Sequence, residues 1–160
     1  MKITAVAFLA LASAAVFAAP VQDDVKVPDH QFIVAGDIKW VDAPPSLPAG
    51  AKAAVIEGNP AKPGPFTMRL KLPADYKIAP HFHPAIEHVT VLSGTAHIGV
   101  GDALDEAKTT PIGPGGFVVM QTGVKHFLWT KEEVVLQGHS IGPWGITYAN
   151  PSDDPRNSKK

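Results

Sequence analysis

The sequence predicts an all-β protein, a sandwich or small barrel built from short strands. Its 16 prolines and 14 glycines are spread along the whole chain rather than gathered in a linker, which is typical of many strands joined by turns. Phe66 to Leu72 alternates between apolar and polar residues, as a half-buried strand does. No stretch of the chain shows a clear helical period.

The first 18 residues have the features of a signal peptide. Lys2 supplies a positive charge, Ile3 to Phe17 is almost wholly apolar, and small residues follow. The apolar run is short for a bilayer span and no stop-transfer pattern follows it, although a retained N-terminal anchor is the alternative. We expect cleavage after Ala18, with Ala19 as the other permissible site. The mature protein would then be exported, periplasmic or secreted, without stable membrane insertion.

The rest of the chain has the length of one domain. We expect an N-terminal segment over residues 19–46 with one strand, a β-barrel over residues 47–149 and a frayed tail over residues 150–160. Ten strands are expected: Phe32 to Val41, Ala53 to Ile56, Phe66 to Leu72, the stretch around His81 and His83, Glu87 to Val91, Thr95 to Val100, Phe117 to Gln121, Lys125 to Thr130, Val134 to Ser140, and Pro143 to Tyr148.

The composition excludes several functions. The net charge is −1 and the chain has no basic stripe, so we expect no nucleic-acid partner. The chain has no cysteine, which excludes disulfides, thiolate catalysis and cysteine-based zinc sites.

The stretch PHFHPAIEHVTVLSG, residues 80–94, has the pattern of a metal site. Residues two apart in an extended chain point to one face, so His81 and His83 can offer both imidazoles to one ion. Pro84 interrupts the strand, and a short bend can return Glu87 to the same centre. The best candidate for a further ligand is His126, which begins a later strand after the turn at Gly123.

Three imidazoles and one carboxylate suit Fe(II), Mn(II), Ni(II), Cu(II) or Zn(II). We therefore expect one divalent transition metal ion per chain. The other histidines, His30, His88, His97 and His139, are interpreted as non-ligands, because alternation or a loose context points them elsewhere.

The two stretches resemble the two motifs of the cupin family. His81, His83, Glu87 and Gly94 match the first motif, and Gly115, Gly123 and His126 match the second. The departures are Asp75 for the opening glycine of the first motif, and Gln121 and Thr130 for the proline and the asparagine of the second.

The wider sequence, from about Leu47 to Arg156, looks most like the small single-domain ChrR-like cupins. This resemblance implies a double-stranded β-helix, or jelly-roll barrel, with a metal site of three histidines and one glutamate. Since cupins commonly pair through sheets near their N-terminal strands, it also implies a homodimer.

Two functions fit these observations. The first is a metal-dependent enzyme of oxygenase, isomerase or lyase type that acts on a small organic molecule. The alternative is a non-catalytic domain that binds or senses a metal or ligand. Leu128 is in phase with His126 and is expected to line the pocket. Arg69 would hold a substrate carboxylate if the polar face of its strand turned inward.

Overall fold

The computed structural model describes residues 30–157. The expected signal peptide and both expected cleavage sites lie outside these described residues. The chain divides into two compact units, residues 1–32 and residues 33–160, and every strand described below belongs to the second unit. None of the helices within residues 30–157 has the length and apolar character needed to cross a bilayer.

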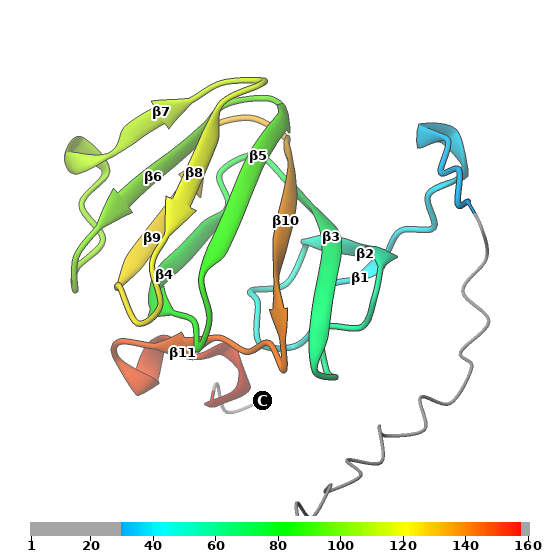
Figure 1. Ribbon diagram of the computed structural model, residues 1–160. Helices are drawn as coiled ribbons and strands as arrows, with labels where there is room; N and C mark the ends of the chain where they lie inside the picture. The colour runs from blue at the N-terminus through cyan, green and yellow to red at the C-terminus, as the bar shows by residue number, and fades with distance from the viewer. Residues whose placement is uncertain (1–29, 158–160) are drawn as a thin grey trace, which may run out of the picture. The chain divides into compact units, whose positions relative to one another are not determined.

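Two antiparallel sheets make up the second unit, which confirms the expected all-β fold (Figure 1). The six-stranded sheet has the order β1-β2-β3-β10-β5-β8, and the five-stranded sheet has the order β11-β4-β9-β6-β7. The strands are β1 Val41–Asp42, β2 Lys52–Glu57, β3 Gly64–Leu72, β4 Lys77–Phe82, β5 Glu87–Ser93, β6 Ala96–Val100, β7 Thr110–Ile112, β8 Phe117–Met120, β9 His126–Thr130, β10 Val134–Gly142 and β11 Thr147–Tyr148. The described residues also contain four 3-10 helices: η1 Ala35–Asp37, η2 Glu106–Lys108, η3 Pro151–Asp153 and η4 Pro155–Asn157.

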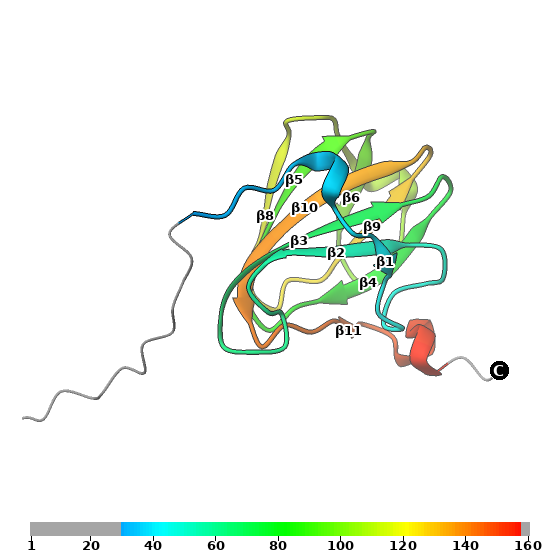
Figure 2. The same ribbon diagram turned by 90° about the vertical axis from the view of Figure 1, so that its right-hand side faces the viewer.

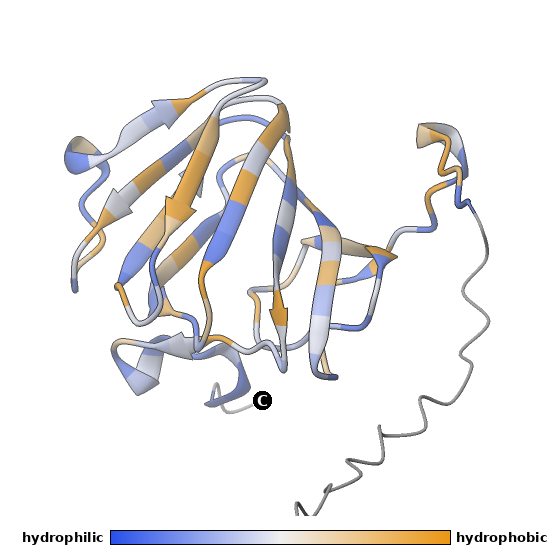
Figure 3. Cartoon of the chain, in the orientation of Figure 1, coloured by the Kyte–Doolittle hydropathy of each residue, from blue (hydrophilic) through white to orange (hydrophobic). Residues whose placement is uncertain are grey.

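Alternation along the strands separates an apolar interior from polar outer faces. Hydrophobic and hydrophilic residues alternate along β5 (Figure 3). Val89 and Val91 are buried, whereas the neighbouring His88 and Thr90 are only partly buried. Because successive side chains of a strand point to opposite faces, this pattern turns the two valines toward the facing sheet.

The apolar core closes one end of the space between the sheets. Leu72, Val91, Ala96 and Val134 are each fully buried, and they come from four different strands of both sheets. None of these four side chains lines the cavity described below. The other part of the interior is therefore left for the functional site.

Thr130 and Asp75, two of the departures from the cupin motifs, act on the turn between β3 and β4. The Thr130 hydroxyl donates to the Pro73 carbonyl at 2.7 Å and accepts from the Tyr76 backbone N–H at 3.0 Å. Asp75 lies in the same turn with a φ of 56°, in the left-handed region that aspartate tolerates better than most residues. A threonine and an aspartate thus supply the turn geometry.

The expected strand Phe32 to Val41 is wrong. The structure has the 3-10 turn η1 at Ala35–Asp37 and only the two residues of β1 at its end. Gly36 and Asp37 are weak strand formers, and the preceding Ile33 and Val34 are 40% and 64% exposed, without a sheet to pack against. The turn η1 lies beyond the outer face of the six-stranded sheet (Figure 2).

The C-terminal segment also differs from the expected frayed tail. It forms η3 and η4, and the Arg156 guanidinium pairs with the Asp154 carboxylate and donates to the Ile146 carbonyl at 3.2 Å. These contacts tie the tail to the segment before β11. The last expected strand is shorter than predicted, because only Thr147 and Tyr148 pair with β4.

Replacing Thr130 with valine should destabilise the protein by about 2 kcal/mol, since the Pro73 carbonyl and the Tyr76 N–H would lose a buried partner. Urea unfolding of the parent and of Thr130→Val measures the difference. Thr130→Ser is the matched control, because it keeps the hydroxyl. Equal unfolding midpoints for the parent and Thr130→Val would contradict this role.

Candidate metal centre

A β-bulge in β4 aims the first histidine into the interior. Ile78 pairs with Leu128, but His81 pairs with His126, so three steps along β4 match two steps along β9. The extra residue lies at Ala79 or Pro80, where proline has no backbone N–H to offer the ladder. Ile78 and His81 therefore both line the interior although they are an odd number of residues apart.

The bulge also sets His81 opposite His126, with ring centroids 4.3 Å apart. His83 follows β4 directly, and its ring centroid is 5.0 Å from that of His81 and 5.2 Å from that of His126. The chain then bends and returns at the start of β5, as the sequence predicted. There, Glu87 Oε2 lies 3.4 Å from His83 Nε2 and 3.6 Å from His126 Nε2.

The structure thus brings together all four residues that the sequence singled out as ligands. His81, His83 and His126 are buried, and each offers a nitrogen within 4.8 Å of the others. Within residues 30–157, this is the one group of three or more histidine, cysteine or acidic side chains close enough to share an ion. Glu87 contacts two of the three imidazoles rather than forming part of the tightest group.

Backbone carbonyls fix the orientation of all three rings. Nδ1 of His81 donates to the Ala79 carbonyl at 2.8 Å, Nδ1 of His83 to the Gly145 carbonyl at 2.8 Å, and Nδ1 of His126 to the Val124 carbonyl at 3.0 Å. A carbonyl can only accept, so Nδ1 carries the proton in each ring. In the neutral ring, Nε2 then has a free lone pair, which is the form that binds a metal ion.

Burial favours the neutral form of His81 and His83. It lowers the pKa of His81 well below 6.5, and the nearby His126 and His83 lower it further. Burial also lowers the pKa of His83, although the Glu87 carboxylate acts in the opposite direction. These two rings can therefore accept a metal ion at neutral pH without losing a proton first.

Two further contacts hold His83. The Trp144 indole stacks on the His83 ring, with centroids 4.1 Å apart and planes inclined by 18°. The backbone N–H of Gly123 donates to the His83 carbonyl at 3.1 Å, and Gly123 has a φ of 74° that favours glycine. The turn at Gly123, in the second of the two motifs, thus holds the backbone of His83, a candidate ligand from the first motif.

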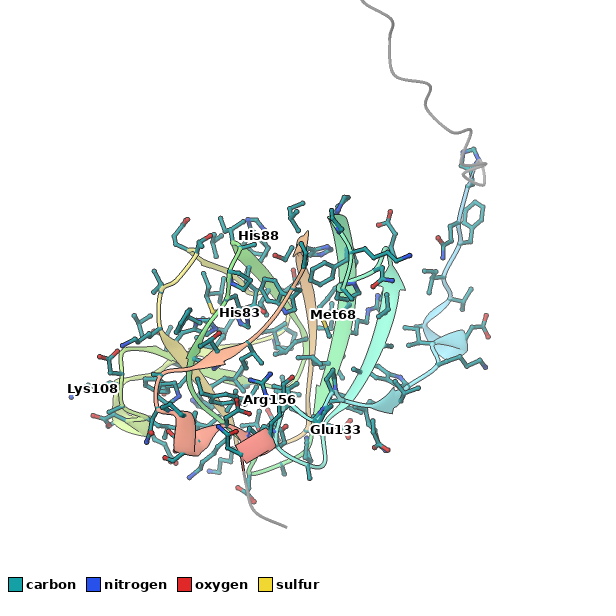
Figure 4. The ribbon with its side chains drawn as sticks, turned by 90° about the horizontal axis from the view of Figure 1, so that it is seen from below. Met68, His83, His88, Lys108, Glu133 and Arg156 are labelled. Carbon is teal, nitrogen blue, oxygen red and sulfur yellow. The ribbon has the colours of Figure 1, made fainter. Side chains whose placement is uncertain are left out.

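The histidine cluster opens onto a cavity of about 450 Å³ between the two sheets. Met68 and His83, which both line it, lie in the interior, while Lys108 lies at the periphery (Figure 4). Most of the wall is apolar and includes Leu47, Phe66, Met68, Leu70, Ile78, Val89, Ile98, Met120, Leu136, Trp144 and Ile146.

Leu128 lines the cavity, as the sequence predicted. Arg69 does not. Its strand turns Met68 and Leu70 to the cavity and Arg69 to the outer face, where its Nε donates to Gln137 Oε1 at 2.9 Å. The expectation that Arg69 holds a substrate carboxylate is therefore corrected, because the alternation of β3 is set by burial of the apolar residues.

The remaining histidines of the second unit have other contacts. His88 stacks on Phe117 with centroids 5.8 Å apart, and His97 stacks on Trp129 at 4.0 Å. His139 lies at the cavity wall, but its Nδ1 is bonded to Thr67 Oγ1 at 2.9 Å and its Nε2 to the Gln137 amide at 3.2 Å.

Sequence reasoning missed the bulge, the three carbonyl partners and Trp144. A proline inside a strand, directly before the first histidine, was a usable signal for the bulge. The stacking of Trp144 had no signal, because it depends on how the segment after β10 crosses the cavity.

The fold is that of solved cupin structures. Solved structures with this fold include the polyketide cyclase RemF from Streptomyces resistomycificus, with 17% identity, a TM-score of 0.64, and coverage of 79% of this chain and 89% of that one. An RmlC-like cupin from Shewanella frigidimarina has 14% identity and a TM-score of 0.55 over 71% of this chain and 93% of that one.

The ChrR resemblance is likewise one of fold. The complex of SigE with the anti-sigma ChrR from Rhodobacter sphaeroides matches with 16% identity and a TM-score of 0.51, over 67% of this chain and 51% of that one. No protein-family model and no curated protein matches the sequence.

The stability of the metal-free protein should fall as the pH drops below 6.5. The unfolded chain binds a proton at His81 near pH 6.5, whereas the buried ring resists protonation until a much lower pH, so acid favours unfolding. Above pH 6.5 this group should cause no change. Melting temperatures of chelator-treated protein between pH 8 and pH 5 would measure the effect, at up to about 1.4 kcal/mol per pH unit.

His81→Gln should flatten that pH dependence, and His88→Gln, outside the cluster, should retain it. A metal-free His81→Gln protein with the same pH profile as the parent would show that His81 is not the source.

Proposed function

We propose that this protein is an exported, metal-dependent enzyme that acts on a small organic molecule, by oxygenase, isomerase or lyase chemistry. The observation that carries the proposal is the position of the cluster. Three buried imidazoles and one carboxylate meet at the wall of a largely apolar cavity of about 450 Å³. A site built only to hold the fold together would not need that cavity.

The residues fit a divalent transition metal. Three nitrogens with free lone pairs and a nearby carboxylate oxygen suit Fe, Mn, Ni, Cu or Zn, and the carbonyl bonds to Nδ1 provide the orientation that metal-ligating histidines require. When bound, such an ion would supply a Lewis-acid or redox-active centre.

Glu87 is the residue placed to move a proton. Among the described residues that line the cavity, the only other carboxylate is Asp42, which is paired with Lys52 at 2.7 Å. The nearby Ser140 hydroxyl donates to the Ile86 carbonyl at 2.7 Å and is already engaged. Glu87 lies beside two imidazoles and is 18% exposed, so it can reach both the cluster and a bound molecule.

The alternative is a domain that binds or senses a metal or a small ligand without catalysis. Two observations favour it: the likeness of fold to the ChrR complex, and the presence of only one acid–base side chain beside the imidazoles among the described residues. In this case the ion would stabilise the barrel rather than turn over a substrate.

Glu87→Gln separates these two functions. Parent and variant would be loaded separately with Fe(II), Mn(II), Ni(II), Cu(II) and Zn(II), then assayed for oxygen consumption and product formation with small phenols, diketones and acids. We expect at least one active metal form in the parent and a loss on the order of 100-fold in Glu87→Gln, because a proton-transfer group is removed while the amide keeps its shape.

Glu57→Gln, an exposed change in β2, is the matched control and should keep full activity. His126→Ala should lose the metal, as measured by elemental analysis. Inertness with every metal, together with a large metal-dependent rise in melting temperature, would favour the binding domain.

We also propose that the mature protein is a homodimer. The segment before β2 exposes Ile33 and Val34 to solvent, at 40% and 64%, and projects from the outer side of the six-stranded sheet (Figures 1 and 2). These apolar side chains would be covered by a second copy of the chain. Light scattering should give the mass of a dimer, and a shift toward monomer in a variant with Ile33→Asp and Val34→Asp. A monomeric parent at high micromolar concentration would refute the dimer.

A further inference from the structure

The charge of the cavity wall restricts what the cavity can bind. Among the described residues that line it, none is lysine or arginine. Its carboxylates are Glu87, next to the imidazoles, and Asp42, whose pKa is lowered by Lys52 so that it stays negative. An anion inside would lose its hydration and meet no protein cation.

The one arginine close in sequence is held away from the cavity. Arg69 lies between two lining residues of β3, but its Nε donates to Gln137 Oε1 at 2.9 Å. The Gln137 amide in turn contacts His139 Nε2 at 3.2 Å, and His139 Nδ1 bonds Thr67 Oγ1 at 2.9 Å. This chain of hydrogen bonds begins at His139 in the cavity wall and holds the Arg69 side chain on the outer face of β3.

The wall offers few free polar groups. Its largest side chains include Phe66, Met68, Leu136 and Trp144. Outside the histidine cluster, the Ser140 hydroxyl and both ring nitrogens of His139 are already hydrogen-bonded. A molecule with many hydroxyl groups would therefore leave most of them unpaired, which costs about 1–3 kcal/mol for each group.

Apolar residues also line the parts of the cavity that reach solvent. Val41 and Val55 line it and are 62% and 56% exposed. An apolar molecule would cover these side chains as it enters and would gain from removing apolar surface from water.

We propose that the cavity binds an uncharged, largely apolar organic molecule that presents an oxygen atom to the metal centre, rather than a sugar acid, a phosphate ester or another anion. The contact with the metal rests on the proposed function. The preference for an uncharged apolar skeleton rests on the wall alone.

Two probes with one skeleton test this. 2-Acetyl-1-naphthol is neutral at pH 7 and carries a chelating ketone and hydroxyl, whereas 1-hydroxy-2-naphthoate has a carboxylate in place of the ketone. Fluorescence titration of metal-loaded protein should show the ketone binding at least about tenfold more tightly than the carboxylate. The metal-free protein should bind the ketone more weakly and the carboxylate not detectably.

The two proposals fail in different ways. If the metal leaves both affinities unchanged but the ketone is still preferred, the metal contact fails and the substrate class stands. If the metal-loaded protein binds the carboxylate as tightly as the ketone, or binds neither probe, the substrate class is overturned.

A variant pair gives a second test. Met68→Lys places a cation in the cavity wall and should shift the preference at least about tenfold toward the carboxylate. Ile141→Lys adds the same charge at an exposed position of β10 that does not line the cavity, and it should keep the preference of the parent. Melting temperatures would establish that both variants fold, and an unchanged preference in a folded Met68→Lys protein would count against the proposal.

Discussion

Three imidazoles can share one buried space only if they remain neutral and are held in a single orientation. Each Nδ1–H donates to a backbone carbonyl, which fixes the orientation of the ring, and burial lowers the pKa of His81 and of His83. The bulge in β4, the turn at Gly123 and the stacking of Trp144 all act on this arrangement. The cavity, the proposed metal and the proposed chemistry depend on it.

The spacing of the sequence was sufficient to predict which residues meet. His81 and His83 share a face because strands have a period of two, and Glu87 and His126 return through turns marked by proline and glycine. The spacing could not reveal that the alternation shifts by one residue within β4, because a bulge depends on pairing with β9. The spacing also could not reveal that Arg69 points outward, because that depends on which face of β3 is buried.

The predictions made from local composition alone were less successful. Ile33 and Val34 favour a strand, but they have no neighbouring strand in the second unit and remain exposed. The C-terminal residues are polar and rich in turn formers, which suggested fraying, yet Arg156 reaches back to Ile146 and orders them. In both cases a tertiary contact, present or missing, overrode the local preference.

The candidate metal ligands and much of the apolar wall of the cavity come from different strands. The four candidate ligands come from β4, β5, β9 and the residue after β4, whereas Phe66, Met68, Leu70 and Leu136 come from β3 and β10. A substitution on β3 can therefore reshape the space beside the cluster without turning an imidazole, since those rings are tied to main-chain carbonyls of other segments. Proteins built this way can exchange one small molecule for another over evolution while their metal chemistry is inherited unchanged.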